Sequence, residues 1–460
     1  MQGVKTNPSL VEGPLFSKMV MYVIPIILTG VLQLLYNTAD QIVVGQFSGD
    51  PNALAAVGST ASATGLIVNV IIGMSAGAVV VMSQSFGARH EQLISRAVHT
   101  VVTFAAIAGL VFATLGFFVT RPLLVALGTK SEYIESAINY MQIIMCGVPA
   151  SVIYNFAACV YKAKGDSRTP FIILSLSGIV NVVLNLIFVI IFGMGVAGVA
   201  TATIISQYIS AATVLILLMR SRESYRLDIR RLGVDFVMLK RILTVGVPSG
   251  IQSAFFAFSN MLVQSAINTL SVSEVGGNTV GNAIDSYTYT ILNSFYHATL
   301  TFVGQNFGAG RMDRVKRTLR LSCIQVVVIG IAVGFLFAVF SRELAFLFVD
   351  MSQPNAMEVI EAATVRNWVT LPFYFICGIM ESLTAYQRAL GSSLRPMVVT
   401  LFSVCVFRVI WAKLIFPIFG GAVALYVVYP LSWFICMVFH LIFSIRLTKK
   451  IIRTHKELIL

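Results

Sequence analysis

Long apolar stretches without charged residues alternate with short polar segments along the whole chain. Six stretches contain no Asp, Glu, Lys or Arg: residues 54–86, 98–120, 137–160, 171–192, 194–219 and 245–270. Each is longer than the roughly 20 residues that a helix needs to cross a bilayer. Because lipid offers the backbone no hydrogen-bond partner, these stretches are predicted to be transmembrane helices.

Six further stretches, with at most two charges each, extend the pattern to twelve spans. The predicted spans are residues 19–44, 54–86, 98–120, 137–160, 171–192, 194–219, 245–270, 280–303, 321–340, 367–385, 396–418 and 421–445. The first span is longer than the ~7 to 15 residues of a signal-peptide core, so we expect it to be retained. The predicted fold class is an all-α integral membrane protein.

Three pairs of short segments show that the chain contains a duplicated unit. The pairs are Ser83–Arg89 with Gly304–Gly310, Lys164–Pro170 with Leu390–Pro396, and Pro25 and Asn37 with Pro248 and Asn260. Their spacings lie between 221 and 226 residues, so each copy contains six spans. An even number of spans gives both copies the same orientation. We therefore expect two six-helix lobes, residues 1–220 and 236–460, related by a pseudo-twofold axis along the membrane normal and joined by a cytoplasmic linker, residues 221–235.

The charge distribution predicts the orientation in the membrane. The chain carries a net charge of +13, and 26 of its 32 Lys and Arg residues lie in the two ends and in alternate loops. The opposite loops hold four: Arg121, Lys130, Arg342 and Arg366. This asymmetry predicts that both termini are cytoplasmic. It also favours contact with anionic lipid head groups over nucleic acid binding. The longest outer loop is predicted at residues 341–366, too short for a separate domain.

Five charged residues fall inside the predicted spans: Asp40, Asp285, Glu381, Arg408 and Lys413. A charge at mid-bilayer costs about 2.5 to 3.5 kcal/mol or more, so each should face a cavity or a partner. Asp40 ends a polar stripe on one helical face, formed with Thr29, Gln33, Tyr36 and Asn37. Such a stripe is expected to face the interior of the helix bundle.

Asn181, Asn185 and Thr203 are predicted to lie at a depth similar to that of Asp40, in the outer half of the N-terminal lobe. One carboxylate with amide and hydroxyl oxygens suits Na⁺, which prefers oxygen ligands as Ca²⁺ does. The same set suits a carboxyl that takes and releases a proton. The structural alternative is a hydrogen-bond cluster that holds helices together.

The C-terminal lobe offers secondary candidates, Asp285, Glu381 and Arg408. Tyr289 shares a helical face with Asp285. Depth allows Asp285 to pair with Lys413 and, less easily, Glu381 with Arg408, and structural ion pairs are the alternative to a functional role.

The six cysteines have neither metal-ligand nor disulfide spacing and are interpreted as core residues. Pro25 should kink the first span, either as a static bend or as a hinge.

The twelve spans, the duplicated unit, Ser83–Ala88 and Lys164–Pro170 resemble the multidrug and toxic compound extrusion (MATE) family, in its bacterial DinF-like branch. The resemblance implies a V-shaped pair of lobes around a central cleft, and efflux of amphipathic, often cationic compounds in exchange for Na⁺ or H⁺. It implies that Asp40, Asn181, Asn185 and Thr203 form the cation site, which holds Na⁺ if sodium is the coupling ion. It also implies that the first helix bends at Pro25.

Some family features differ here. Asn185 replaces an Asp found in some relatives. Glu381 lies near the tenth-helix acid of the NorM-like branch, whose seventh-helix acid has no counterpart in residues 245–270. These differences favour the N-terminal lobe as the coupling site.

The functional hypothesis is cation-coupled multidrug efflux by alternating access. Gln33, Tyr36, Asn37 and Tyr289 are the expected substrate contacts. We expect a monomer in the bacterial inner membrane that binds small drugs and lipids, with no cofactor other than Na⁺ as a coupling ion. Two alternative functions are a lipid-linked saccharide flippase and, more distantly, an intramembrane enzyme. A lipid-linked saccharide flippase would need more cationic residues in its cavity, and an intramembrane enzyme would need an acid pair or a His-Glu or Ser-Lys set, which the isolated histidines do not supply.

Overall fold

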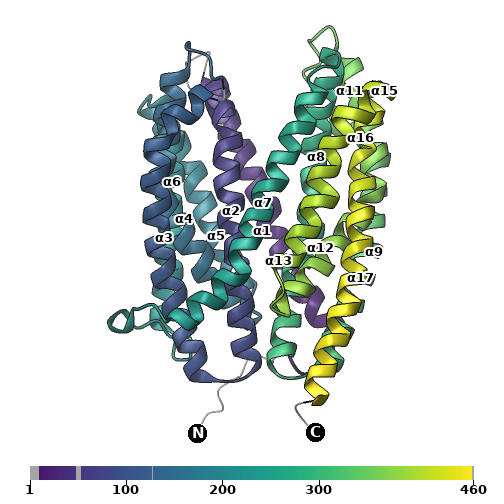
Figure 1. Cartoon of the computed structure of the whole chain (residues 1–460). Coiled ribbons are helices and arrows are strands. Elements are labelled where there is room, and N and C mark those ends of the chain that lie inside the picture. Colours follow the sequence, from purple (N-terminus) through teal and green to yellow (C-terminus); the bar gives the residue numbers. More distant parts are fainter. Residues whose placement is uncertain (1–9, 48–52, 127, 458–460) are drawn as a thin grey trace. The chain divides into compact units, whose positions relative to one another are not determined.

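Long helices account for most of the structure, a computed structural model that describes residues 10–47, 53–126 and 128–457 (Figure 1). In the N-terminal half these are α1 Leu15–Phe47, α2 Ala53–Gly87, α3 Glu91–Ala126, α4 Ile134–Lys164, α5 Arg168–Leu186 continued by the π-helical η1 Ile187–Ile191, α6 Gly195–Arg220 and the short 3₁₀ turn η2 Ile229–Arg231. Residues 1–9 of the predicted cytoplasmic N-terminal tail lie outside the described part of the chain.

The C-terminal half repeats this arrangement with more interruptions. Its elements are α7 Phe236–Ile267, α8 Val272–Gly308, α9 Met312–Val339, α10 Ser341–Ala345, α11 Ala356–Thr370, the 3₁₀ turn η3 Leu371–Phe373, α12 Tyr374–Ala389, α13 Leu394–Thr400, the π-helical η4 Leu401–Val406, α14 Phe407–Ile410, the π-helical η5 Trp411–Ile415, α15 Phe416–Phe419, α16 Gly421–Tyr426 and α17 Val428–Glu457.

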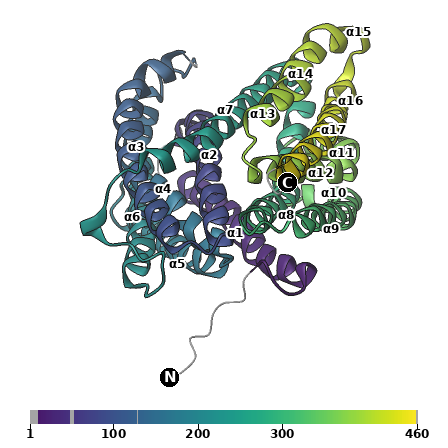
Figure 2. The same cartoon turned by 60° about the horizontal axis from the view of Figure 1, so that its bottom comes forward.

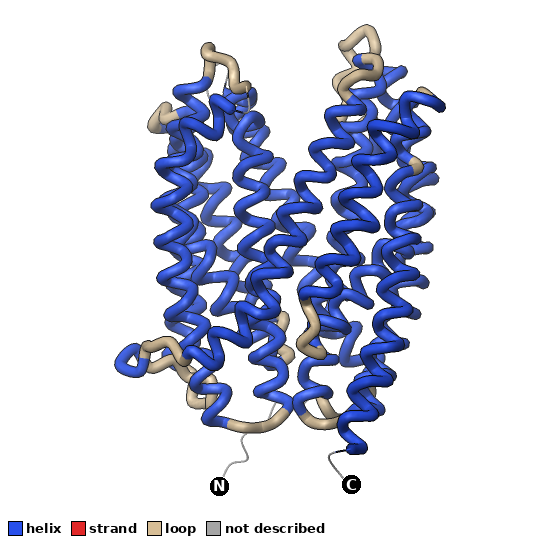
Figure 3. Tube along the Cα trace, in the orientation of Figure 1, coloured by secondary structure: helices blue, strands red, loops and turns tan. Residues whose placement is uncertain are grey.

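The prediction of twelve spans in an all-helical membrane fold is confirmed. Among the described residues, eleven helical segments are long and apolar enough to cross a membrane. The remaining predicted span, the eighth at residues 280–303, lies in α8, whose 37 residues are long enough but more polar than those of the other helices. The tube in Figure 3 shows long helices joined by short loops. Lipid as solvent explains this regularity, because only closed backbone hydrogen bonding is tolerated there.

The chain forms two compact units, residues 24–250 and the described residues of 1–23 together with 251–460. In the first unit α4 packs against α2, α3 and α6, and α3, α4 and α6 lie side by side (Figure 1, Figure 2). In the second unit α8 and α12 pack against each other and against α9, and α12 also contacts α17. The lobe boundaries at 220 and 236 come from the sequence repeat and stay a prediction.

The chain passes between the two units close to two prolines. One boundary falls between Val23 and Ile24, next to Pro25 in α1, and the other between Gly250 and Ile251, next to Pro248 in α7. These prolines occupy equivalent positions in the repeat. Thr29 Oγ1 donates a hydrogen bond of 2.7 Å to the Pro25 carbonyl, in the turn that follows the ring, whereas the helical hydrogen bond that proline cannot make belongs to the preceding turn.

The outer segment at residues 341–366 differs from the sequence-based prediction. It was expected to be a loop, but it contains α10, and α11 begins at Ala356. The tenth membrane-spanning segment therefore runs from Ala356 to Ala389. Arg366, assigned to an outer loop from the sequence, is buried within it with 1% exposure. Glu358 and Glu361 lower the hydropathy of this first part, which is why the pattern missed it.

Glycines allow the closest helix contacts, as expected where apolar lipid provides little drive for helix association. A Cβ added at Gly77 of α2 would lie 2.1 Å from the Ile242 carbonyl oxygen of α7. At Gly65, on the same helix, an added Cβ would meet nothing within 4 Å. The two glycines therefore form a matched pair for mutagenesis.

We expect Gly77→Ala to destabilise the protein by about 1 to 3 kcal/mol, since overpacking against backbone leaves no flexible side chain to move. Gly65→Ala should be neutral or stabilise slightly, because Ala is the better helix former. Thermal unfolding of both purified variants in detergent measures the difference. Equal melting temperatures would contradict close α2–α7 packing.

Candidate functional site

The structure brings together four polar residues of the N-terminal half that the sequence placed at one depth. Asn185 Nδ2 donates a short hydrogen bond to Asp40 Oδ1, which joins α5 to α1. The same amide nitrogen lies 3.4 Å from Asn181 Oδ1, and Asn181 Nδ2 donates to Thr203 Oγ1 of α6 at 3.3 Å. Helical spacing explains this, since residues 181 and 185 are one turn apart on the same face. Three helices therefore contribute to one connected cluster, which we call the Asp40 cluster.

Burial distinguishes the members of the Asp40 cluster. Asn185 is fully buried and Asn181 is 6% exposed, whereas Asp40 and Thr203 are partly buried. Asn185 Oδ1 is buried without a hydrogen-bond partner. A buried amide oxygen without a donor is costly and calls for an explanation. This orphan oxygen, the Asp40 carboxylate, Asn181 Oδ1 and Thr203 Oγ1 are oxygen groups of the types that hard cations take as ligands.

An apolar layer packs around the Asp40 cluster. Val43 and Val44 of α1 form a buried hydrophobic group with Val189 of η1 and with Val196 and Val199 of α6. The partly buried Tyr140 of α4 packs against this group, and its phenol interacts electrostatically with Asp40. The sequence analysis did not select Tyr140, although Ser136 lies one turn before it on the same face of α4.

The predicted substrate-contact residues differ in their surroundings. Gln33 and Asn37 of α1 are exposed. Tyr36 is partly buried, and its hydroxyl donates to the Ser175 carbonyl of α5 at 3.2 Å. Its ring lies over Gly178, where an added Cβ would come within 1.9 Å of it. Tyr289 of α8 is 38% exposed, and its hydroxyl accepts a hydrogen bond of 2.7 Å from Asn293 Nδ2.

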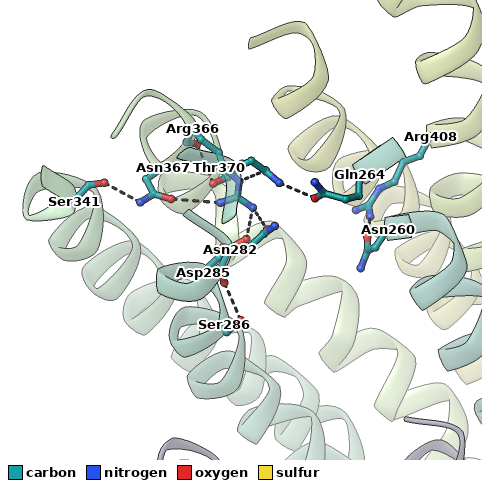
Figure 4. A network of polar contacts seen from close by, with 11 residues as sticks. Asn260, Gln264, Asn282, Asp285, Ser286, Ser341, Arg366, Asn367, Thr370 and Arg408 are labelled. Atoms are coloured by element: carbon teal, nitrogen blue, oxygen red, sulfur yellow. Dashed lines mark hydrogen bonds and ion pairs between the residues drawn. The ribbon is translucent and has the colours of Figure 1, made fainter. Parts of the chain in front are cut away.

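A second polar network, centred on Arg366, lies in the C-terminal half (Figure 4). Its guanidinium donates to Asn278 Oδ1 at 2.9 Å and to Asn282 Oδ1 at 2.5 Å. Arg366 Nη2 also forms an ion pair with Asp285 Oδ2 at 2.9 Å. Depth along the spans allowed Asp285 to pair with Lys413, but its ion-pair partner in the structure is Arg366. The reason is the helical extension at α11, which carries Arg366 into the bundle.

Glu381 and Arg408 do not pair either. Among the described residues no Lys or Arg nitrogen lies within 4.0 Å of the Glu381 carboxylate. Glu381 is partly buried and interacts electrostatically with Arg388, two turns further along α12. Arg388 donates to the Tyr296 hydroxyl at 2.5 Å and to Gln252 Oε1 at 2.9 Å. The Glu381–Arg408 ion pair that depth allowed is therefore not formed, and Arg408 donates instead to Ser432 and Asn260.

Arg366 and Arg388 are the polar residues that sequence reasoning underestimated. A signal for Arg366 was present, since Asn278, Asn282 and Asp285 place three acceptor groups on one face of α8. Such a face requires a donor, and a guanidinium with five N–H groups is the side chain best able to supply it.

Comparisons with known proteins match this chain to transporters of one family. The MatE family model matches residues 25–187 and 248–414. The probable multidrug resistance protein YoeA of Bacillus subtilis is 28% identical over 407 residues, covering 87% of this chain and 86% of that protein. YpnP of the same organism, also named a probable multidrug resistance protein, is 28% identical over 397 residues, covering 86% and 87%.

A solved structure, titled as the outward-facing conformation of a multidrug resistance MATE family transporter of the MOP superfamily, has the same fold. The TM-score is 0.89 at 22% sequence identity, covering 97% of this chain and 99% of that one.

Proposed function

Because the chain belongs to the MatE family of multidrug efflux transporters, we propose that it exports amphipathic, often cationic organic compounds in exchange for Na⁺ or H⁺. The observation that carries the proposal is the Asp40 cluster, where a carboxylate meets a buried amide oxygen that has no donor. A transporter can exchange two ligands only if each binds its inward and outward states with different affinity. A cation bound at Asp40 supplies that difference.

Asp40 holds the coupling cation in this proposal, with Asn181, Asn185 and Thr203 as neutral ligands. A bound Na⁺ would satisfy Asn185 Oδ1, and a proton on Asp40 would instead turn one carboxylate oxygen into a donor. Either event neutralises the charge of Asp40 and changes the bonding between α1 and α5. Asp285 and Glu381 are secondary candidates, and the ion pair with Arg366 makes Asp285 the less available of the two.

Pro25 is the proposed hinge through which the cation acts. It lies 15 residues before Asp40 on the same helix, next to the point where the chain passes from one compact unit to the other. A helix that lacks a hydrogen bond at this point bends at lower cost. Repacking of α1 around a neutralised Asp40 would then be relieved at Pro25. Pro248 is placed in the same way on α7.

Gln33, Tyr36, Asn37 and Tyr289 are the proposed substrate contacts. Gln33 and Asn37 offer exposed amides, and Tyr289 offers a partly exposed aromatic ring. A few polar groups among apolar and aromatic walls are typical of sites for drug-sized molecules. A ring face also attracts organic cations. The Tyr36 ring of α1 lies against Gly178 of α5. A substrate that rotates this ring would therefore change the packing between the two helices.

We also propose a monomer in the bacterial inner membrane with both termini in the cytoplasm. The charge asymmetry supports this orientation and is stronger once Arg366 is counted as buried rather than as an outer-loop residue. A role in flipping lipid-linked saccharides is less well supported, since no Lys or Arg takes part in the hydrogen bonds of the Asp40 cluster. Transport rather than catalysis fits the family.

Reconstituted transport tests the proposal directly. Purified protein in liposomes should move a cationic fluorescent dye against its gradient when either a Na⁺ gradient or a pH gradient is imposed, with the other held at zero. The effective gradient identifies the coupling ion. Protein-free liposomes and protein without a gradient are the controls. Dye movement that is equally fast without any gradient would contradict exchange and favour a uniport or flippase mechanism.

A further inference from the structure

The sequence repeat relates a second polar site in the C-terminal half to the neighbourhood of the Asp40 cluster, with Arg408 at the position that corresponds to Asn185 and Val263 at that of Asp40. Asn37 of α1 corresponds to Asn260 of α7, 223 residues later. The π-helical stretches η1 and η5 begin at Ile187 and Trp411, 224 residues apart. Asn185 lies two residues before η1, and Arg408 lies three residues before η5. Single π-helical turns within α-helices are frequent at functional sites.

The charge at this second site is inverted. In the N-terminal half an amide on the fifth helix, Asn185, donates to a carboxylate on the first. In the C-terminal half a guanidinium on the fifth span, Arg408, donates from Nη1 to an amide on the first, Asn260 Oδ1, at 2.7 Å. Figure 4 shows the Arg408 guanidinium directed at Asn260. The site in the N-terminal half therefore carries the negative charge of Asp40, and the site in the C-terminal half carries the positive charge of Arg408.

Arg408 lacks an anionic partner among the described residues. It is 1% exposed, and Nε donates to Ser432 Oγ at 3.1 Å. Its guanidinium lies over the Tyr429 ring at 4.5 Å and the Phe256 ring at 5.3 Å. Nη2 is buried with no hydrogen-bond acceptor. By contrast, the buried Arg366 has Asp285 within 2.9 Å.

An unpaired buried arginine requires a physical explanation. Arginine does not lose its proton in proteins, so burial cannot neutralise it. Buried charges are otherwise paired or bound to an ion, because the desolvation cost is large. The two aromatic rings offset part of this cost. The remaining donor, Nη2, is the position where an acceptor is missing.

Asn260 is exposed although it accepts a hydrogen bond from the buried guanidinium, so displacement of this one side chain would uncover Nη1. We propose that Arg408 binds the carboxylate of an organic substrate, which takes the place of Asn260 Oδ1 on Nη1 and adds the missing acceptor on Nη2. A guanidinium matches a carboxylate in this two-point geometry. Phe256 and Tyr429 would flank an aromatic ring of the substrate. The substrates would then include zwitterionic and anionic compounds, an extension that rests on the proposed export function.

A pair of dyes that differ only at the carboxylate tests this proposal. Tetramethylrhodamine has a free carboxylate, and in tetramethylrhodamine methyl ester the same group is blocked. Binding of each dye to purified protein in detergent is measured by fluorescence polarisation. Arg408→Gln should weaken binding of the free acid about 10-fold or more, the usual loss for a charge-assisted pair. Binding of the ester should change less than about 3-fold.

The controls separate this site from general charge and from folding. Lys413→Gln removes an exposed cation from the same span and should leave both dyes unaffected. Arg408→Lys keeps the charge and should recover part of the binding of the free acid. Melting temperatures of all variants show whether they fold. Equal losses for both dyes in Arg408→Gln, or no loss for either, would overturn the proposal.

Two further results would also count against a substrate site. If chloride or inorganic phosphate stabilised the wild type through Arg408 while the protein did not distinguish the two dyes, the site would hold a small inorganic anion instead. Ester export driven by an ion gradient tests the proposed function separately. Failure of that export with intact discrimination between the dyes would count against the function but not against the anion site.

Discussion

Asp40→Asn should reduce gradient-driven dye efflux from proteoliposomes to the level of protein-free liposomes. The substitution keeps the shape of the side chain and the hydrogen bond with α5, but it removes the only charge in the Asp40 cluster. A neutral amide neither takes up a proton nor attracts Na⁺ with comparable strength. Binding of dye should persist. What should disappear is its dependence on the coupling ion, expected at about 5- to 150-fold in the wild type.

Two variants serve as comparisons for Asp40→Asn. Asp313→Asn makes the same chemical change at an exposed side chain of α9 and should transport normally. Glu381→Gln should have a milder effect if coupling resides in the N-terminal half. Full, gradient-dependent efflux by Asp40→Asn would rule out Asp40 as the coupling acid.

Arg366→Met should destabilise the protein by about 3 to 5 kcal/mol, the usual cost of removing one partner of a buried ion pair. Asp285 would keep its charge, 13% exposed, without its cation. Asn278 and Asn282 would lose their donor as well. Thermal unfolding of the purified protein in detergent measures the loss, which should also lower the yield of folded protein.

A double-mutant cycle separates the charge from the packing. Asp285→Asn combined with Arg366→Met leaves no uncompensated charge, so it should recover part of the stability lost in Arg366→Met alone. Arg342→Met, at an exposed position of α10, is the matched control and should change stability little. An Arg366→Met protein as stable as Arg342→Met would show that the Arg366 network does not hold α8 and α11 together.

The positions of the helices could be predicted because membrane insertion depends on local properties. Length and hydropathy decide whether a segment crosses lipid, and both can be counted along the chain. Predicted and observed spans therefore agree in number and order. The tenth has the largest error at its start, since it begins at Ala356 rather than at residue 367, and Glu358, Glu361 and Arg366 lower the average hydropathy there. The seventh, eighth and ninth helices also begin eight or nine residues before the predicted spans. A charged residue lowers the hydropathy average of its own segment even when a partner on another helix allows it to be buried.

The composition of the Asp40 cluster could be anticipated for a related reason. Helical periodicity fixes which residues of one helix share a face, and the depth of each residue follows from its distance to the end of the span. Together these restricted Asp40, Asn181, Asn185 and Thr203 to one region before any contact was known. Their role as a cation site remains a prediction that transport has to test.

Partner choice was decided only by the tertiary structure. From depth alone Lys413 could have reached Asp285 and Arg408 could have reached Glu381, but the packing of α8 against α11 and of α7 against the α14 segment gave other partners. Several helices meet at each depth, and their rotations are set jointly by close contacts such as Tyr36 on Gly178. A side-chain bond depends on distances of a few tenths of an ångström between helices far apart in sequence. Periodicity along one helix determines which of its residues share a face. It does not determine which residues of a neighbouring helix pack against that face.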